Sequence, residues 1–327
     1  MRTAVTGSIA TDHLLTFPGV FTDQLLAERL ERVSLSFLAD RLEVRRGGVA
    51  ANICYGLGLL GLRPVLVGAA GGDFEPYRLH LKEHGIDTDS VHISESRHTA
   101  RFVCTTDRAQ NQIATFYAGA MAEARTIDLR RVVARVGRLD LVVVSPDDPE
   151  AMIRHTDACR ALNIPFAADP SQQLARLERK EVRRLLEGAR WLFGNEYEAA
   201  LLQERSGWST SQILDRVGCW VTTLGDSGVR LRQKGRPDTG IPAVPVEGVV
   251  DPTGVGDAFR AGFVAALSWN LPREVAAQFG CTVAATVLDY IGTQEYRLYR
   301  EPLLSRMRTS YGVPAAARVV PHLRELP

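Results

Sequence analysis

The stretch DPTGVGDAFRAG, residues 251–262, combines three glycines and two carboxylates and then turns apolar. Glycines that follow a strand and open a helix let backbone N–H groups converge on an anion at the positive end of that helix. Asp257 is the distinguishing residue, because a carboxylate beside a phosphate is unfavourable unless it takes a proton from a hydroxyl that attacks the phosphate. The alternative is an aspartate that caps the helix. Taken alone, the stretch favours the capping role, and the rest of the chain has to decide.

Two common nucleotide-binding motifs are absent from this stretch. It has no G-x-x-x-x-G-K-[ST] sequence, which excludes a P-loop. It also lacks the third glycine of the dinucleotide fingerprint G-x-G-x-x-G, because Phe259 stands in that position. The sequence therefore argues against a dinucleotide-dependent oxidoreductase.

The composition is that of an ordinary globular protein. The chain has 327 residues, of which 45% are apolar and 24% charged, and its formal net charge is +1. This balance gives no reason to expect nucleic acid or a membrane surface as partner. No run approaches the roughly 20 apolar residues of a membrane helix, and the N-terminal residues have no apolar leader pattern. Five scattered cysteines without disulfide or zinc spacing complete the prediction of a soluble, cytoplasmic protein.

Short apolar runs alternate with longer helical patterns along most of the chain. Near-continuous apolar strands separated by helices predict a parallel sheet covered on both faces, with ligands at the carboxyl ends of the strands. The expected strands are 4–9, 65–68, 139–144, 166–168, 191–193 and 220–223, and the expected helices are 49–60, 75–84, 149–162, 180–187, 209–216, 258–269 and 273–290.

Two segments interrupt this alternation and predict a second, smaller sheet. Residues 13–46 contain a partly alternating stretch, and residues 97–118 are typical of two strands joined by a polar turn. Together they predict a small antiparallel β lid over a ligand site, inserted twice into a core of residues 1–12, 47–96 and 119–327. Exposed strand edges in such a lid invite a second subunit, so we expect a homodimer through the lid.

A glycine pair and an aspartate predict contacts with a hydroxylated ligand. Gly47 and Gly48 would let a ligand approach the backbone, and Asn52, one turn into the following helix, would reach a hydroxyl. Asp12 lies just beyond the first expected strand, where its two oxygens would accept hydrogen bonds from adjacent ribose hydroxyls. The alternatives are a tight turn with a capping Asn52 and an Asx turn at Asp12.

Asn195 and Glu198 follow the strand expected at 191–193 and fit two compatible roles. A carboxylate near phosphate groups suits Mg²⁺, which retains several waters and takes few protein ligands. The same spacing predicts a capping box at the start of a helix. Gly225 and Gly228 indicate only an ordinary turn on local grounds.

Four motifs together resemble the signatures of the ribokinase-type carbohydrate kinases, the PfkB family. They are RGGVAANICYGLGLLG at 46–61, GNEYEA at 194–199, TTLGDSG at 222–228 and DPTGVGDAFRAGF at 251–263, in the order of that family. The resemblance implies a ribokinase-like three-layer α/β/α core with a mostly parallel central sheet and a small antiparallel lid. The chain departs from the family signature at Pro252, where a threonine is frequent.

The resemblance also implies the roles of individual residues. Asp257 is then the base on the acceptor hydroxyl, and the backbone amides of Gly254, Val255 and Gly256 form an anion hole for the transferred phosphoryl group. Glu198 is implied to bind Mg²⁺ through water, and K⁺, which often helps family members, is implied near the same loop. The residues implied to bind ATP are Asn195, Thr223, Gly225 and Gly228.

Within the family, several segments are similar to bacterial adenosine kinases of the actinobacterial type: AVTGSIATDHLL, VSLSF, HTARFVCTTD, FAADPSQQLARL and GTQE. This similarity implies ATP-dependent phosphorylation of adenosine on its 5′-hydroxyl, giving AMP and ADP. Ribose, fructose or another nucleoside is the alternative acceptor, and a nucleoside-binding protein without turnover is the alternative function. The residues implied to bind the nucleoside are Ser8, Asp12, Ser36, Gly48, Asn52, Phe102, Phe116, Gln172 and Gln173.

The side chains themselves give partial support for a purine ligand. Phe102 and Phe116 lie on the two expected lid strands, and two aromatic rings that face one cleft would stack on a base. Lid core and dimer interface are the alternative roles of these rings. Gln172 and Gln173 follow a strand end, and a glutamine side chain can pair with the N6/N7 edge of adenine.

Overall fold

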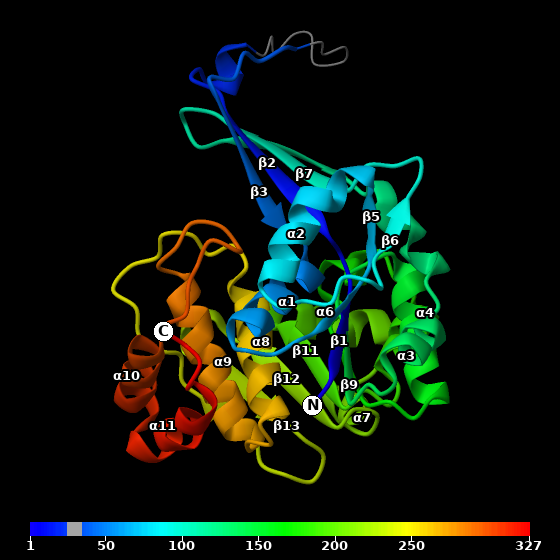
Figure 1. Ribbon diagram of the computed structural model, residues 1–327, viewed down its shortest axis with the longest axis vertical. Coiled ribbons are helices and arrows are strands. Elements are labelled where there is room, and N and C mark those ends of the chain that lie inside the picture. Colours follow the sequence, from blue (N-terminus) through cyan, green and yellow to red (C-terminus); the bar gives the residue numbers. More distant parts are fainter. Residues whose placement is uncertain (25–34) are drawn as a thin grey trace.

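An eight-stranded sheet forms the centre of the computed structural model, which describes residues 1–24 and 35–327 (Figure 1). Its strands are β1 (Thr3–Thr6), β4 (Val65–Val67), β9 (Leu141–Val144), β10 (Phe166–Ala168), β11 (Trp191–Asn195), β12 (Cys219–Thr223), β13 (Val229–Arg232) and β14 (Thr239–Ile241). Their order is β14-β13-β12-β11-β10-β9-β1-β4, and only β13 and β14 pair antiparallel with their neighbours.

Helices cover both faces of this sheet, because successive strand residues point to opposite sides. Val5 and Val143 pack under one layer, whereas Ala4 and Val142 pack under the other. The first layer consists of α1 (Val49–Leu59), α2 (Glu75–Glu83), α8 (Val255–Ser268), α9 (Arg273–Val287), α10 (Arg300–Tyr311) and α11 (Val313–Val319). The second consists of α3 (Leu129–Val136), α4 (Pro149–Ala161), α5 (Arg179–Leu186), α6 (Glu196–Ser206) and α7 (Thr210–Leu214).

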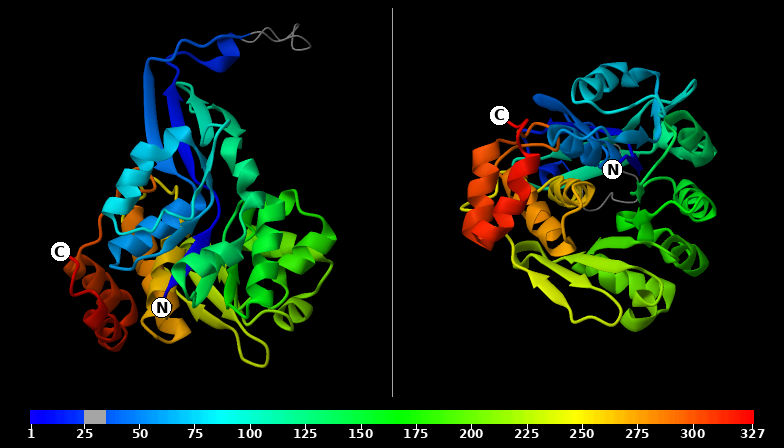
Figure 2. Two further views of the ribbon diagram at one scale, coloured as in Figure 1. Left: turned by 45° about the vertical axis from the view of Figure 1, so that its right-hand side comes forward. Right: turned by 60° about the horizontal axis from the view of Figure 1, so that its bottom comes forward.

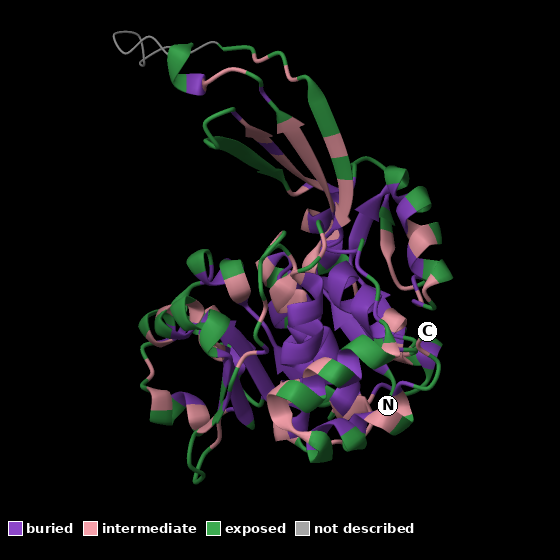
Figure 3. Cartoon of the chain, turned by 90° about the vertical axis from the view of Figure 1, so that its left-hand side faces the viewer, coloured by how far each residue is buried: buried purple, intermediate pink, exposed green. Residues whose placement is uncertain are grey.

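A four-stranded sheet projects from the core at the carboxyl end of β1 (Figure 2). It contains β2 (Ala10–Thr16), β3 (Arg41–Gly47), β7 (Ala100–Thr106) and β8 (Gln112–Tyr117), in the order β3-β2-β7-β8. The outer pairs are antiparallel and the central β2–β7 pair is parallel. Figure 3 shows that buried residues concentrate in the core, whereas the strands of this sheet are mostly half-buried or exposed.

The predicted fold class is confirmed, since a mostly parallel sheet between two helical layers carries a small, predominantly antiparallel sheet. We call this small sheet the lid. It begins at Ala10, earlier than the expected boundary at residue 13, because β1 ends at Thr6 and the chain enters β2 after a short turn. β5 (Ala69–Gly71) and β6 (His92–Ser94) form a separate, parallel two-stranded sheet. No helix in the described ranges is long and apolar enough to cross a membrane.

Candidate active site

Two cavities share the loop before α8 as a common wall. The larger one, of about 700 Å³, is lined by Pro252, Val255 and Gly256 of this loop, and we call it the apolar cavity. The other, of about 520 Å³, is lined by Thr253, Gly254 and Asp257 together with residues of the lid, and we call it the lid cavity. Neighbouring residues of one short segment therefore face two different ligand-sized spaces.

The local conformation of this loop depends on glycine and on Asp251. Gly254 adopts a φ of +78° just before α8, and a Cβ there would lie 2.8 Å from the side chain of Thr293. The carboxylate of Asp251 accepts hydrogen bonds from the N–H groups of Thr253 and Gly292, each at 2.9 Å. The first N–H groups of α8 have no partner within the helix and carry its positive partial charge. The loop thus presents an anion-binding helix end between the cavities.

Asp257 stands in the first turn of α8 and does not cap the helix. The N-cap is Gly254, and no side chain provides a capping hydrogen bond there. Instead, Asn52 Nδ2 donates to Asp257 Oδ2 at 2.9 Å. Burial raises the pKa of Asp257 to about 6, while Arg260 and the hydrogen bond from Asn52 act in the opposite direction. With a pKa about one unit below neutral pH, the carboxylate of Asp257 is mostly ionised there and can still accept a proton.

A buried ion pair sits directly behind this carboxylate. In it, Arg260 Nη2 lies 2.7 Å from Asp169 Oδ1 and Arg260 Nε lies 2.5 Å from Asp169 Oδ2. Both side chains are buried, and Asp169 follows the last residue of β10. Because Asp169 neutralises much of the guanidinium charge, the field of Arg260 at Asp257 is weakened and Asp257 stays basic.

One row of residues across the lid lines the lid cavity. Asp12 lies opposite Phe102 in the β2–β7 register, and Phe102 lies opposite Phe116 in the β7–β8 register. Residues that are directly opposite project from the same face of a sheet, and all three line the lid cavity. Asp12 therefore belongs to a strand rather than to an Asx turn. Burial, followed by the charge of Glu295, raises the pKa of Asp12 to about 6.

The glycine pair brings the start of α1 against the first core strand. Gly48 has a φ of +94°, and a Cβ there would lie 2.6 Å from the backbone oxygen of Ser8. Ser8 Oγ accepts a hydrogen bond from Val49 N at 3.0 Å and so caps α1. Asn52 is therefore free of the capping role, and its buried side chain lines the lid cavity.

The remaining residues that were predicted to bind the nucleoside divide into two groups. Gln172 and Gln173 lie in a 3₁₀ turn after β10 and both line the lid cavity, Gln172 exposed and Gln173 buried. Ser36 is exposed, and it does not line this cavity. Sequence reasoning did not name seven residues that line this cavity. All of them except Met121 and Pro146 lie within the segments quoted above: Ala10, Val49, Met121, Pro146, Arg176, Thr253 and Thr293.

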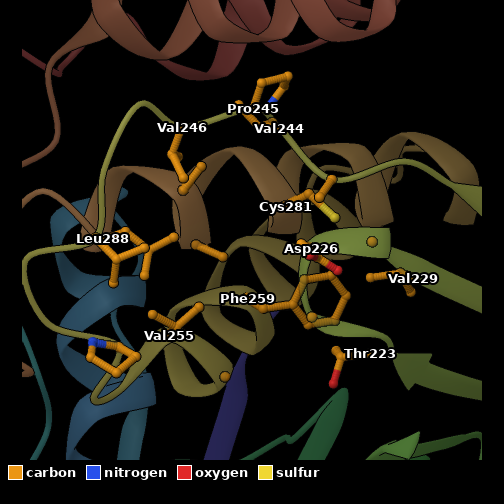
Figure 4. A pocket seen from close by; sticks show the side chains of 18 residues that line it. Thr223, Asp226, Val229, Val244, Pro245, Val246, Val255, Phe259, Cys281 and Leu288 are labelled. Carbon is orange, nitrogen blue, oxygen red and sulfur yellow. The ribbon is translucent and has the colours of Figure 1, made fainter.

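The apolar cavity is formed almost wholly by aliphatic and aromatic side chains and by backbone. Figure 4 shows Val244 and Val246 of the loop after β14 across from Val255 and Phe259 of α8. Three of the residues predicted to bind ATP line this cavity: Thr223, Gly225 and Gly228. Gly225 and Gly228 both have a positive φ. A Cβ on Gly228 would lie 2.1 Å from the backbone oxygen of Ile241, so only glycine fits this turn.

Asn195 and Glu198 form the predicted capping box at the start of α6 and line neither cavity. Asn195 Oδ1 accepts from Glu198 N, and Glu198 Oε2 accepts from Asn195 N, each at 2.8 Å. Glu198 Oε1 also accepts from Ser171 Oγ at 3.0 Å. The capping role is therefore observed, and a role toward ligands stays a prediction for both residues.

The geometry joins the carboxylate of Asp257, a helix N-terminus and two cavities at a single loop. A phosphoryl group held at the N-terminus of α8 would be within reach of ligands in both cavities, and Asp257 faces the cavity that the lid covers. Such an arrangement suits transfer of a phosphoryl group from one bound ligand to a hydroxyl of another. The fold and the site are those of a phosphotransferase.

Comparison with known proteins agrees with this class. The profile of the pfkB family of carbohydrate kinases matches residues 20–298. A nucleoside kinase of Methanothermobacter thermautotrophicus is 31% identical over 257 residues, which cover 78% of this chain and 82% of that protein. The structure of Burkholderia thailandensis nucleoside kinase in complex with inosine is 32% identical, covers 95% of this chain and 99% of that chain, and superposes with a TM-score of 0.82. A ribokinase of Bacillus subtilis is 25% identical over 293 residues, covering 89% of this chain and 94% of that protein.

The chain therefore belongs to the pfkB family of carbohydrate kinases. It is a kinase of the ribokinase type, a phosphotransferase with the fold of nucleoside kinases and ribokinases. Kinases of this type use ATP, typically with Mg²⁺.

The residues present fit a magnesium ion that is bound mainly by phosphate and water. No cluster of three or more His, Cys, Asp or Glu residues suited to a metal occurs in the described part of the chain. Asp169 is paired with Arg260, whereas each oxygen of Glu198 accepts one hydrogen bond and retains a lone pair. Mg²⁺ keeps several waters and takes few carboxylates, so Glu198 suits a contact through water.

Proposed function

We propose that this protein transfers the γ-phosphoryl group of ATP to the 5′-hydroxyl of adenosine, giving AMP and ADP. The observation that carries the proposal is the row Asp12–Phe102–Phe116 in the cavity that Asp257 also lines. Two rings suit a base, a carboxylate suits the adjacent hydroxyls of a ribose, and a second carboxylate suits the hydroxyl that reacts. A free sugar would leave both aromatic rings without a partner.

In the proposed reaction, ATP occupies the apolar cavity and its phosphates reach the N-terminus of α8. Adenosine lies in the lid cavity with its base against Phe102 and Phe116. Asp257 accepts the proton of the 5′-hydroxyl as that oxygen bonds to the γ-phosphorus, and the bond from phosphorus to the β,γ-bridging oxygen breaks to release ADP. The amides of residues 254–256 stabilise the charge on the transferred group.

Two ions complete the proposal. Mg²⁺, with Glu198 contacting it through water, would neutralise charge on the β- and γ-phosphate oxygens when bound. K⁺ near the loop 251–257 is proposed from the family resemblance alone, and an assay with and without K⁺ tests it.

Adenine is supported by Gln173, whose buried side chain lines the cavity at the end of β10. A glutamine amide can donate to N7 and accept from the 6-amino group of adenine. The relative that is solved with inosine favours a nucleoside over a free sugar. Inosine lacks the 6-amino group, so the discrimination between these two nucleosides rests on the glutamine contact.

The test is ADP release from Mg-ATP by the purified protein with adenosine, inosine, guanosine, ribose and fructose as acceptors. We expect adenosine to give the highest kcat/KM. Preference for ribose or fructose would keep the phosphotransfer chemistry and overturn the assignment of the two phenylalanines. Nucleoside binding without ADP release from any acceptor would replace the enzyme by a binding protein.

We also propose that the protein is a homodimer through the lid. Leu42, Val44, Ile113 and Tyr117 lie on the lid face opposite Phe102, and between 44% and 58% of each is exposed. Apolar side chains gathered on a sheet face favour association with a second apolar surface. The mass in solution at micromolar concentration tests this, and a single monomeric species would contradict it.

A further inference from the structure

We infer that Gln294 is a positioning residue, which fixes the side-chain amide of Asn52 in the orientation that donates to Asp257. This inference rests on the proposed function, because it concerns the base of the proposed reaction. Gln294 follows Thr293 in the loop between α9 and α10, and it is buried. Gln294 belongs to the GTQE segment quoted above, which gave it no role, and it lines neither cavity.

A continuous chain of hydrogen bonds joins Gly47, at the end of β3, to Asp257. Tyr77 of α2 donates its hydroxyl to the backbone oxygen of Gly47 at 2.9 Å. Gln294 Nε2 donates to that hydroxyl oxygen and also to Asn52 Oδ1, the second bond at 2.9 Å. Asn52 Nδ2 then donates to Asp257 Oδ2 at 2.9 Å. Three core elements and the end of β3 thus meet through buried side chains.

The polarity of this chain is fixed at its far end. The carbonyl oxygen of Gly47 can only accept, so Tyr77 must donate to it and present its oxygen to Gln294. Gln294 must then turn its amide nitrogen toward Tyr77, and the second N–H of that nitrogen reaches Asn52 Oδ1. Asn52 is left with its nitrogen facing Asp257. The backbone carbonyl of Gly47 therefore fixes the orientation in which Asn52 donates a hydrogen bond to Asp257.

This orientation has a chemical consequence for the base. A hydrogen bond donated to a carboxylate stabilises its ionised form, whereas an amide oxygen facing it would repel that form. Burial has already raised the pKa of Asp257 to about 6, so losing the donor moves the base further toward the neutral, inactive form. Loss of a hydrogen bond to a charged group raises the pKa of a carboxylate by about one to two units.

Other titratable groups lie around this chain of hydrogen bonds. Arg260 on α8 and Asp169 after β10 face Asp257, the one lowering its pKa and the other raising it. Burial lowers the pKa of His80, next to Gln294, to about 4, so His80 is neutral at the pH of the assay. Burial raises the pKa of both Tyr77 and Tyr296. His80, Tyr77 and Tyr296 therefore keep their charge near pH 6 to 7, and Asp12, whose pKa is about 6, is the same in every variant below.

The test is the pH dependence of kcat/KM for the acceptor that wild type prefers, from about pH 5 to 9, since kcat/KM reports groups of the free enzyme. Gln294→Glu and Gln294→Leu both remove the amide N–H groups that donate to Asn52 and Tyr77. The first substitution adds a negative charge and the second does not. We expect the acid limb of both variants to move up by about one pH unit, with activity partly restored at high pH and the KM for ATP unchanged. Gln203→Glu on α6 lines neither cavity and is the matched control for the added charge.

A further variant, which leaves Gln294 in place, tests the inference if the Gln294 variants do not fold. Tyr77→Phe keeps Gln294 but removes the group that fixes its polarity, and we expect a smaller shift in the same direction. Lower activity with an unchanged acid limb in all folded variants would show a merely structural role and overturn the inference. Absence of activity in wild type would instead overturn the proposed function, so the two failures are distinguishable.

Discussion

The apolar cavity and the lid cavity differ in how much of the chain builds them. The lining of the apolar cavity comes from residues 223–288, and most of its side chains are Val, Ala, Leu, Pro or Phe. The lining of the lid cavity runs from Ser8 to Thr293 and includes two aspartates, an asparagine, two glutamines and an arginine. One cavity therefore binds through shape and backbone, and the other through side-chain chemistry that distant segments supply.

Under the proposed function, selectivity and proton transfer belong to the lid cavity, and general nucleotide affinity belongs to the apolar cavity. The loop at 251–257 is the part that both share. Substitutions on the lid side should thus change the rate, the acceptor preference and the pH dependence, whereas substitutions on the apolar side should change the KM for ATP alone.

The largest effect is expected for Asp257→Asn. Removing a positioned general base costs about 10²–10⁴-fold in rate, so kcat with adenosine should fall by that factor. Asn is nearly isosteric, and adenosine binding, measured by calorimetry, should stay within a few-fold of wild type. A variant that keeps most of its kcat would assign the proton transfer to another group.

The acid limb of the pH profile is expected to involve two protons. Burial raises the pKa of both Asp257 and Asp12 to about 6, and both must be ionised, one to take a proton and one to accept ribose hydrogen bonds. Below that pH, kcat/KM for adenosine should fall about 100-fold per pH unit, tenfold for each group. Asp12→Asn should reduce the slope to one proton. A single-proton limb in wild type would remove one of these carboxylates from the account.

Phe102→Ala should weaken nucleoside binding but not ATP binding. Base–aromatic stacking contributes about 1–3 kcal/mol, which predicts a rise of roughly 5- to 150-fold in the KM for adenosine. Val103→Ala, the next residue of β7 on the opposite face of the lid, is the control and should leave that KM near wild type. Equal effects of the two substitutions would point to a general weakening of the lid.

The smallest effect is expected on the apolar side, for Val246→Ala. Val246 is half-buried in the wall of the apolar cavity (Figure 4). Removing two buried carbon groups costs at most about 1.5 kcal/mol, so the KM for ATP should rise by roughly three- to tenfold. The KM for adenosine and kcat at saturating ATP should not change. A changed acceptor preference would break the division between the two cavities.

The α/β core was predictable because its strands are short, fully apolar runs. The strand at 166–168 coincides with β10, and α4 and α5 lie within a residue of the expected ranges. The β13–β14 hairpin was not predicted, because polar residues fill VRLRQKGRPDTGI and the segment lies at the edge of the sheet. Helices α10 and α11 were also missed, since their many charged and small residues weaken the periodic pattern.

The candidate site was predictable where a motif is local and not where it depends on tertiary contacts. Glycines and carboxylates near strand ends indicate a ligand, and the structure brings all the predicted acceptor residues except Ser36 to one cavity. Their roles stay predictions. Gln294 and Arg260 could not be assigned from sequence, because their partners are Asn52, 242 residues away, and Asp169, 91 residues away. Only the folded chain shows that Gln294 contacts Asn52 and that Arg260 pairs with Asp169 beside Asp257.

The transfer of γ-labelled phosphate from Mg-ATP to adenosine tests the central claim most directly. If the loop at 251–257 holds one phosphoryl group between two ligands, the label should appear in adenosine 5′-monophosphate in equal amount to the ADP formed. No labelled nucleotide product should form from 5′-deoxyadenosine, which lacks the acceptor hydroxyl. Label recovered as inorganic phosphate, or left in ATP while adenosine is bound, would contradict the account.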